Sequence, residues 1–440
     1  MTAEHPAAPD DILISYGSQG SWAWTGVRLE PAPTAAEHGG FAGLPEEQRR
    51  AEAVSREQVW LAEQGQPRGG HRIELRYVND PVTRRVSCTL LGQVHAPDPA
   101  GAAAAARALR TRLRAAPRHV RAGELDAAGV RSALMPFGPD AAQQGPVHPA
   151  DPEHLPEPTV LPGVAEVRKG LSWAWSTRYD ARFRVGVLVH PLAGGAVSWE
   201  PVWDALARQE HRTMVGVCLE PYEVGEGLRS RLAYLAQEYG RLAAPGTPNP
   251  VYQQPVPPDP FAVRAAPAYH DAAHRYTGHA FRLRVAVAAD GPVPVHLAEV
   301  VASTLSDAGA AGRTGGPVTA VPGSGVGGRA AVCVPRGDEA ATAWRNVTAI
   351  NRSWLEETYR QGVPEGHMGQ VERILGDLVD LPEATAAFRF PYEIPGRPPL
   401  FATETRWEAR READVPGAGG RRGGAADPHF PDLPGTGGLR

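Results

Sequence analysis

The sequence predicts an α+β protein built from successive small strand–helix–strand units of the ferredoxin-like kind, with mixed or antiparallel sheets and Pro/Gly-rich linkers. Three observations support this fold class. Apolar and polar residues alternate in HRIELRYV (71–78), which is the period of a strand. Trp199, Trp203 and Leu206 recur at i, i+4 and i+7, which is the period of a helix. The 49 glycines and 44 prolines fall mostly in the stretches between such patterns.

The first predicted domain covers residues 1–136. Its patterns give, in order, a strand pair at 12–30, a helix at 45–64, hairpin strands at 71–78 and 84–96, and a helix between 98 and 117. Asp98 followed by Pro99 has the residue types of an N-cap and a first helical turn, which places the start of the last helix.

Two further domains are expected after a Pro-rich, polar linker at 137–164. The domain at 165–250 gives strands at 183–190 and 213–219 and helices at 199–206 and 228–242. The domain at 251–410 gives helices at 261–276, 293–308, 338–360 and 371–379 and strands at 279–289 and 330–334. The Gly-rich tail at 411–440 is expected to be disordered.

Two short phrases occur twice. SWAW spans Ser21–Trp24 and Ser172–Trp175, and LEP spans Leu29–Pro31 and Leu219–Pro221. Matches this short carry little weight in a sequence of biased composition, yet they suggest two related α+β units.

The charge balance argues against a dedicated nucleic-acid binder. Lys plus Arg total 45 and Asp plus Glu total 49, a net charge of −4, whereas such binders carry a basic excess or stripe. Cys88, Cys218 and Cys333 lie far apart in apolar runs, so they predict buried side chains in a reducing compartment and no disulfide framework or zinc site. We find no signal-peptide pattern and no membrane span, so a cytoplasmic location is expected.

The segment Pro322–Val332 (PGSGVGGRAAV) has the composition of a phosphate-binding loop. Arg329 stands near the position of the P-loop Lys, Ala330 replaces its Ser or Thr, and a strand follows where a P-loop opens a helix. A flexible loop is therefore the favoured interpretation of residues 307–328, and no cofactor is expected.

His270 and His274 are four residues apart on a predicted helix, with Asp271 and His279 nearby. This spacing suits two metal ligands, but a structural or catalytic zinc site needs at least a third protein ligand. Since no complementary ligand motif is found, a solvated helix surface is favoured and no metal-binding residue is expected.

The segment VLVHPLAGGAVSWEPVWDALA, which contains His190 and the pair Gly194–Gly195, resembles the first strand and oxyanion turn of α/β-hydrolase thioesterases. That family requires a nucleophilic Ser in a GxSxG turn on a later strand. The nearest phrase, Gly366–Gly369 (GHMG), lacks the Ser, so the mechanism has no first step. A degenerate hydrolase of this type is kept as an alternative.

Most of residues 70–410 resembles the region N-terminal to the motor in the HerA/FtsK–VirB4-like family of ATP-binding proteins. Three features carry the resemblance: the unit FRVGVLVH…WEPVWDALARQ…TMVGVCLEP with its long Leu-striped helix, the strand FRLRVAVA with the helix and strand after it, and the helix ending in AAFRFP. In the family this region leads into a Walker A loop, a Walker B strand and an arginine finger. These motifs do not follow AAFRFP here, so no functional residue is carried over and no catalytic residue is expected.

The resemblance implies a non-catalytic accessory or assembly subunit that pairs with a separate P-loop ATPase, with a homo-oligomer as a further expectation. The expected docking element is the phrase EATAAFRFPYEIPGRPPLF (383–401), and its candidate docking residues are Phe388, Arg389, Phe390 and Pro391. Packing of this phrase against its own domain is the alternative. A freestanding structural protein is the remaining hypothesis for the chain as a whole.

Overall fold

The computed structural model describes residues 11–17, 20–32, 44–66, 70–137, 163–247, 255–306, 330–393 and 398–403. The helices and strands in these ranges belong to one compact unit that ends at Ala402, and the chain from Thr403 onward lies outside that unit. Within the same ranges, no helix has both the length and the apolar composition needed to cross a membrane.

Residues 20–124 form a repeat with the order strand–helix–strand–strand–helix–strand. Its elements are β2 (Gly20–Pro31), α1 (Glu46–Gln64), β3 (Arg72–Asp80), β4 (Arg85–Ala96), α2 (Pro99–Arg114) and β5 (Val120–Glu124), with β1 (Leu13–Gly17) before and α3 (Ala127–Leu134) after them. The strands lie in the order β5–β2–β4–β3, all antiparallel, and β1 pairs with the start of β2. This is the ferredoxin-like arrangement. Asp98 caps α2 as predicted, because its side chain accepts a hydrogen bond from the Gly101 amide.

Residues 163–333 repeat this order of strands and helices around a large insertion. Its elements are β6 (Gly163–Arg168), α4 (Glu200–Ala207), β9 (Thr213–Glu223), β10 (His279–Ala289), α7 (Val295–Thr304) and β11 (Ala331–Cys333), followed by α9 (Asp338–Thr348). The strands lie in the order β11–β6–β10–β9, again all antiparallel, so each strand has a counterpart in the first repeat.

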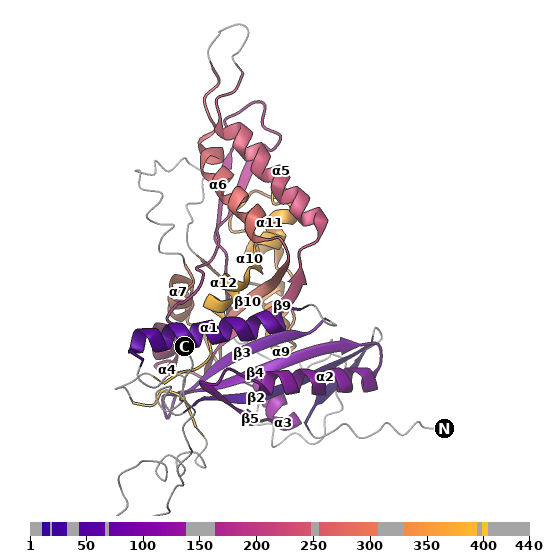
Figure 1. Cartoon of the computed structure of the whole chain (residues 1–440), viewed down its shortest axis with the longest axis vertical. Coiled ribbons are helices and arrows are strands. Elements are labelled where there is room, and N and C mark those ends of the chain that lie inside the picture. The colour runs from indigo at the N-terminus through magenta and orange to yellow at the C-terminus, as the bar shows by residue number, and fades with distance from the viewer. Residues whose placement is uncertain are drawn as a thin grey trace, which may run out of the picture. The chain divides into compact units, whose positions relative to one another are not determined.

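The two repeats join along their edge strands into one sheet (Figure 1). β3 pairs antiparallel with β9 from Ile73↔Leu219 to Val78↔Met214, and the short β12 (Leu378–Val379) adds to β10. Each repeat alone would leave a row of unpaired N–H and C=O groups at this edge, and the pairing satisfies both rows. The predicted α+β class with antiparallel strands is confirmed.

The three domains expected at 1–136, 165–250 and 251–410 share this sheet. β3 comes from the first, β9 from the second and β10 from the third, and the three strands are neighbours. The domain boundaries that linker composition suggested are therefore wrong for the sheet. Strands from all three expected domains pair in it, so these domains do not have separate sheets. Most of the expected linker at 137–164 and all of the expected disordered tail lie outside the described residues.

The repeated phrases fall at positions that are not equivalent. Ser21–Trp24 lies in β2 and Ser172–Trp175 in the inserted strand β7 (Leu171–Trp175), while the two LEP phrases lie in β2 and β9. By topology β2 corresponds to β6, since each is the first strand of its repeat and lies between the third and fourth. The structure thus contains two units with the same order of elements, but the repeated phrases do not occupy equivalent positions in them.

A hairpin and several helices form a subdomain inserted in the second repeat. Its inserted elements are β7, β8 (Val185–Val189), α5 (Glu226–Ala243) and α6 (Pro260–Arg275). After the end of the repeat the chain forms α10 (Glu356–Tyr359) and α11 (Gln370–Leu375), and α11 packs in the same apolar cluster as the inserted elements. β7 and β8 pair antiparallel, and α5 and α6 lie side by side (Figure 1). The Tyr239 and Tyr269 rings stack with centroids 5.0 Å apart, and the Tyr269 hydroxyl donates to the Val187 carbonyl at 2.7 Å.

Two predicted helices are shorter than expected. The helix predicted at 338–360 ends at Thr348, since Ile350 has a φ of 54°, a left-handed conformation that a β-branched residue rarely adopts. The Gln93 side chain donates to the adjacent Ala349 carbonyl at 2.6 Å and so satisfies this helix end. The stripe at 371–379 is divided between α11 and β12.

The helices α1, α2, α4 and α7 supply the apolar side chains that pack on one face of the sheet. On that face Leu75, Val217 and Val285 are fully buried, and Trp199 and Trp203 of α4 pack in the same cluster. Full burial of each such side chain stabilises the fold by roughly 2–3 kcal/mol. The main core therefore lies between this face and the helices.

The opposite face of the sheet is charged, and it is buried as well. The alternation in β3 predicted a half-buried strand with Glu74 and Arg76 toward solvent, yet both are covered. Arg76 Nε donates to Glu74 Oε1 at 2.8 Å, and Arg284 Nη2 of β10 donates to Glu74 Oε2 at 2.6 Å. Opposite charges within β3 and across β9 thus offset the cost of burial that each charge would otherwise carry.

Arg76 also binds the ends of two helices. Its Nη1 donates to the carbonyls of Ala133 at 2.6 Å and Leu134 at 3.0 Å, at the end of α3, and its Nη2 donates to the Val347 carbonyl near the end of α9. The last carbonyls of a helix lack intrahelical partners and carry partial negative charge. Burial lowers the pKa of Arg76, while the Glu74 carboxylate opposes this shift. Arg76 therefore ties the last helix of each repeat to the central sheet.

Replacing Arg76 with Met (R76M) is expected to lower the free energy of unfolding by about 3–5 kcal/mol, because helix-end carbonyls lose a buried donor and Glu74 loses a cation. Arg76→Lys keeps the charge but not the planar fork, so it should recover only part of the loss. Urea denaturation measures both. The matched control R56M removes the surface pair with Glu52 and should cost less than about 0.5 kcal/mol. Equal stability of R76M and R56M would contradict the role of Arg76.

Candidate functional site

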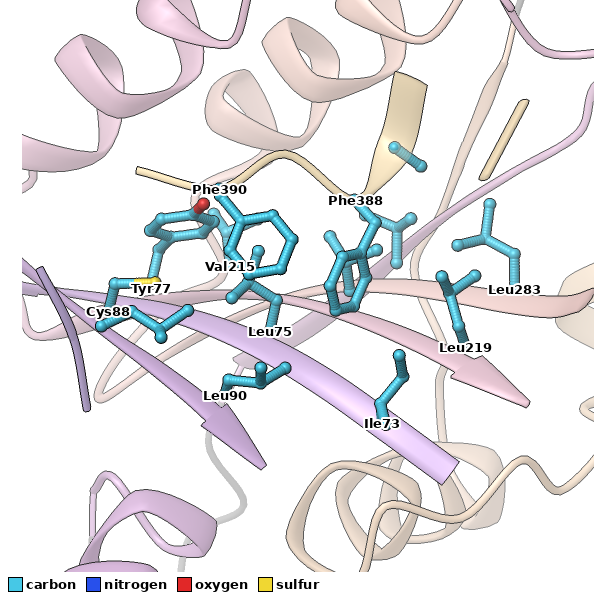
Figure 2. Packing of buried hydrophobic residues seen from close by; sticks show 14 of the residues in the cluster. Ile73, Leu75, Tyr77, Cys88, Leu90, Val215, Leu219, Leu283, Phe388 and Phe390 are labelled. Atoms are coloured by element: carbon cyan, nitrogen blue, oxygen red, sulfur yellow. The ribbon is translucent and has the colours of Figure 1, made fainter. Parts of the chain in front are cut away.

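The four residues predicted to dock a partner lie in the core of this chain. They follow α12 (Leu381–Ala387) and begin a segment, described at 388–393 and 398–403, that we call the strap. Figure 2 shows Phe388 and Phe390 over the apolar face of the sheet, near Leu75, Val215 and Leu219. Arg389 and Pro391 are buried too.

The strap contacts both repeats. The Phe390 ring meets Trp60 of α1 edge-on at 5.1 Å, and the Phe401 ring meets Trp203 of α4 edge-on at the same distance. The Val86 amide of β4 donates to the Leu400 carbonyl at 2.9 Å, and the Ala402 amide donates to the Val86 carbonyl at 2.9 Å. The strap thus fills the space between the helices of the first repeat and those of the second.

A buried charge cluster holds the middle of the strap. Glu57 of α1 lies 2.8 Å from Arg389 Nε through one carboxylate oxygen and 3.0 Å from His119 Nε2 through the other. The Tyr77 hydroxyl donates to the Arg389 carbonyl. The structure therefore shows the alternative foreseen for this phrase, packing against its own domain, and the four side chains offer no surface in this conformation.

Replacing Glu57 with Gln (E57Q) is expected to lower the free energy of unfolding by about 3–5 kcal/mol, because the buried Arg389 guanidinium loses its counter-charge. The control E52Q, five residues earlier on the same helix, affects only a part-exposed pair with Arg56 and should cost less than about 0.5 kcal/mol. Thermal and urea unfolding compare the two variants. If E57Q were as stable as E52Q, the strap would not depend on this cluster.

Partly buried ion pairs attach the segment 338–379 to the charged face of the sheet. Glu220 of β9 is contacted by Arg72 at 3.2 Å and by Arg352 at 2.9 Å, and Arg352 also donates to Asp377 at 2.7 Å. Burial acts to raise the pKa of Glu220, but Arg72 and Arg352 outweigh it and hold that pKa below its ordinary value. These carboxylates are committed to pairs within the chain, which is the behaviour of a structural cluster.

His190 of the hydrolase-like phrase lies beside a serine. Ser172 Oγ and His190 Nε2 are 2.6 Å apart, within the range of a nucleophile–base pair. Burial and the nearby Arg264 lower the pKa of His190 to about 4, so the ring is neutral at pH 7 and a weak base. Both residues belong to the β7–β8 hairpin, whereas an α/β-hydrolase places its Ser at a strand-to-helix turn of a parallel sheet. The position of Ser172 in an antiparallel hairpin therefore differs from that of the nucleophilic Ser in the α/β-hydrolases.

Replacing His190 with Asn (H190N) is expected to flatten the dependence of stability on pH. In the unfolded chain His190 binds a proton near its ordinary pKa of about 6.5, whereas in the folded chain it does so near 4. Its contribution to stability is therefore complete above pH 6.5 and is lost as the pH falls toward 4, by about 3 kcal/mol. Unfolding free energies at pH 7 and pH 4.5 measure the slope. The exposed His296 provides the control H296N, and equal slopes in H190N and H296N would contradict the assignment.

Two other sequence candidates have clear positions. Residues 322–329 of the Gly-rich segment lie outside the described residues, and Ala330 leads into β11, a strand as predicted. His270 and His274 are exposed on α6. Within the described ranges, no three or more His, Cys, Asp or Glu side chains gather as a metal site would require.

The tip of the β7–β8 hairpin displays large exposed side chains. Trp175 is 54% exposed and Tyr179 is 77% exposed, and the Arg182 side chain is 63% exposed. We call these three residues the hairpin surface. Trp, Tyr and Arg are the residue types that dominate the binding energy of protein interfaces.

The loop that carries Tyr179 is rigidly held. The Arg178 guanidinium, which is buried, donates to both carboxylate oxygens of Asp180 at 2.8 Å and to the Ala244 carbonyl at 2.9 Å. The hydrogen bonds from Arg178 hold the pKa of Asp180 well below its ordinary value. The Ser176 hydroxyl donates to Asp259 at 2.6 Å. Tyr179 is thus presented by a fixed backbone, and binding would cost little ordering entropy.

The surroundings of the hairpin surface are basic and aromatic. Arg182 Nη1 donates to the Tyr234 hydroxyl at 2.9 Å, and the Arg231 guanidinium lies 4.8 Å from the Tyr234 ring centroid and 5.6 Å from that of Phe183. Stacked guanidinium groups keep their charge while losing conformational freedom. Since the acidic Glu238 and Asp180 also lie in this region, the arrangement suits a partner that offers chiefly an apolar surface.

The hairpin surface is not predicted by the sequence patterns described above. Trp175 was noticed only within the repeated SWAW phrase, and Tyr179 belonged to no pattern. Their exposure depends on where β7 ends, on the local bond of Arg178 to Asp180 and on the long-range bond of Arg178 to Ala244. A clue was present in STRYDARFR (176–184), where aromatic and Arg residues alternate between two strands.

Comparison with known proteins leaves the sequence-based resemblance untested. No protein-family model and no curated protein matches the chain. The relationship to the HerA/FtsK–VirB4-like family therefore stays a prediction that rests on the phrases of the sequence.

Proposed function

We propose that the chain is a non-catalytic accessory subunit that docks a partner protein through the hairpin surface. The partner that the resemblance implies is a P-loop ATPase made as a separate chain. The proposal rests chiefly on one observation, the display of exposed Trp175 and Tyr179 on a hairpin whose turn is fixed by Arg178.

The energetics of exposure support this role. A water-exposed Trp or Tyr gains far more from burial in an interface than a small or charged residue, and a rigid loop loses little entropy when it binds. The ionised groups of the charged sheet face, by contrast, are paired inside the chain. The uncharged Trp175 and Tyr179 side chains of the hairpin surface are thus free of such pairing constraints and can contact a partner protein.

The tandem arrangement supports an assembly role as well. Two ferredoxin-like repeats in one sheet, closed by the strap, give a firm platform from which the hairpin surface is presented. In the resembled family the corresponding region precedes the motor, so a role beside a motor is a natural extension. The pathway served could be DNA translocation, conjugation-like transfer or defence.

Co-expression with a P-loop ATPase encoded beside this chain tests the proposal. The two proteins are expected to elute together in size-exclusion chromatography. The double variant W175A/Y179A should weaken the complex at least about 30-fold, because the loss of even one hot-spot side chain costs about 2 kcal/mol. Isothermal titration calorimetry measures the affinity.

The control V82A removes an exposed apolar side chain in the turn between β3 and β4 and should leave the affinity unchanged. If W175A/Y179A binds as tightly as V82A, the hairpin surface is not the interface. If the two proteins do not associate, or if the purified chain alone hydrolyses ATP efficiently, the accessory role is wrong and a freestanding protein becomes the better hypothesis.

A further inference from the structure

The helix α6 carries two histidines on its outer side. Its buried residues Phe261, Ala265 and Tyr269 face the inserted subdomain, whereas His270 and His274 are exposed and one turn apart. Their Nε2 atoms lie 3.2 Å from each other, and the ring centroids are 4.6 Å apart. The equivalent nitrogen atoms of the two imidazoles are therefore close enough for one metal ion to reach both.

We propose that His270 and His274 form a chelating site for a divalent transition-metal ion, with copper(II) bound most tightly. A metal ion about 2.0–2.1 Å from each Nε2 would subtend an angle of roughly 100° at the 3.2 Å separation. That angle lies between the square-planar and tetrahedral values, so the separation of the two Nε2 atoms suits an ion of either preference.

The protonation states allow coordination without a net chemical change. At 3.2 Å between the Nε2 atoms, a hydrogen bond forms when one imidazole carries its proton on Nε2 and the other carries it on Nδ1. Binding requires both rings in the tautomer with the proton on Nδ1, so the donating ring shifts its proton from Nε2 to Nδ1 through solvent. The metal ion then replaces that hydrogen bond with two coordinate bonds.

The site is a two-ligand surface site and not a structural zinc centre. Asp271 follows His270 but points about 100° away around the helix, and it lies 3.7 Å from Arg275. Water would complete the coordination sphere, so the ion would exchange readily. Imidazole ligands suit copper, nickel and zinc, and among these copper(II) forms the most stable complexes.

The site is independent of the hairpin surface. It joins residues on two successive turns near the end of α6, so a bound ion would stabilise this part of the helix in the folded chain. An ion that binds the folded chain and not the unfolded one raises the unfolding temperature in proportion to the logarithm of its concentration.

Calorimetric titration of the full, EDTA-treated chain with CuCl2, NiCl2 and ZnCl2 tests the site. The double variant H270A/H274A is expected to bind one copper(II) ion fewer than the unsubstituted chain. Each single variant should bind that ion at least about tenfold more weakly. Electron paramagnetic resonance of the copper-loaded chain should show two imidazole nitrogens, a signal that H270A/H274A should lack.

The control H296A removes a lone exposed histidine on α7 and should change neither the stoichiometry nor the spectrum. Equal unfolding temperatures of the metal-free variants establish that each one is folded. If H270A/H274A binds copper(II) with the stoichiometry, affinity and spectrum of the unsubstituted chain, the ion is held elsewhere and the proposed site does not exist. A preference for zinc over copper would overturn the assignment of the metal.

Discussion

The buried guanidinium of Arg76 is the constraint on which the two-repeat structure depends. It lies on the central strand β3, where one repeat meets the other, and it contacts Glu74 and the last turns of both α3 and α9. A charge removed from water this completely destabilises the fold unless it is paired and hydrogen-bonded, as Arg76 is. Arg76 therefore couples three features of the structure. These are the charged face of the sheet, the positions of α3 and α9, and the pairing of β3 with β9.

The strap imposes a matching constraint on the apolar face. Two ferredoxin-like units placed side by side leave a gap between their helix layers, and Phe388 and Phe390 fill that gap over the shared strands (Figure 2). Arg389, the residue between Phe388 and Phe390 in the sequence, is held by its ion pair with Glu57. The junction is thus closed by polar contacts on one face and by aromatic packing on the other, and neither repeat supplies a complete core alone.

Local patterns predicted the elements well and their associations poorly. Alternation located β3, and Asp98 located the start of α2, because both signals are contained in a few neighbouring residues. The burial of Glu74 depends on Arg284, which is 210 residues away, and no local pattern carries such a pair. The same reason explains the strap and the hairpin surface: a phrase that is apolar at its own positions gives no sign of whether the chain or a partner will cover it.

The position of the strap has a mechanical consequence. Tension applied to the chain at Ala402 would act first on the two hydrogen bonds that Leu400 and Ala402 form with Val86 of the first repeat. It would act next on the Phe401 ring, which lies against Trp203 of the second repeat. Because these contacts belong to different repeats, a pulling force would be shared across the whole sheet before any single strand detached.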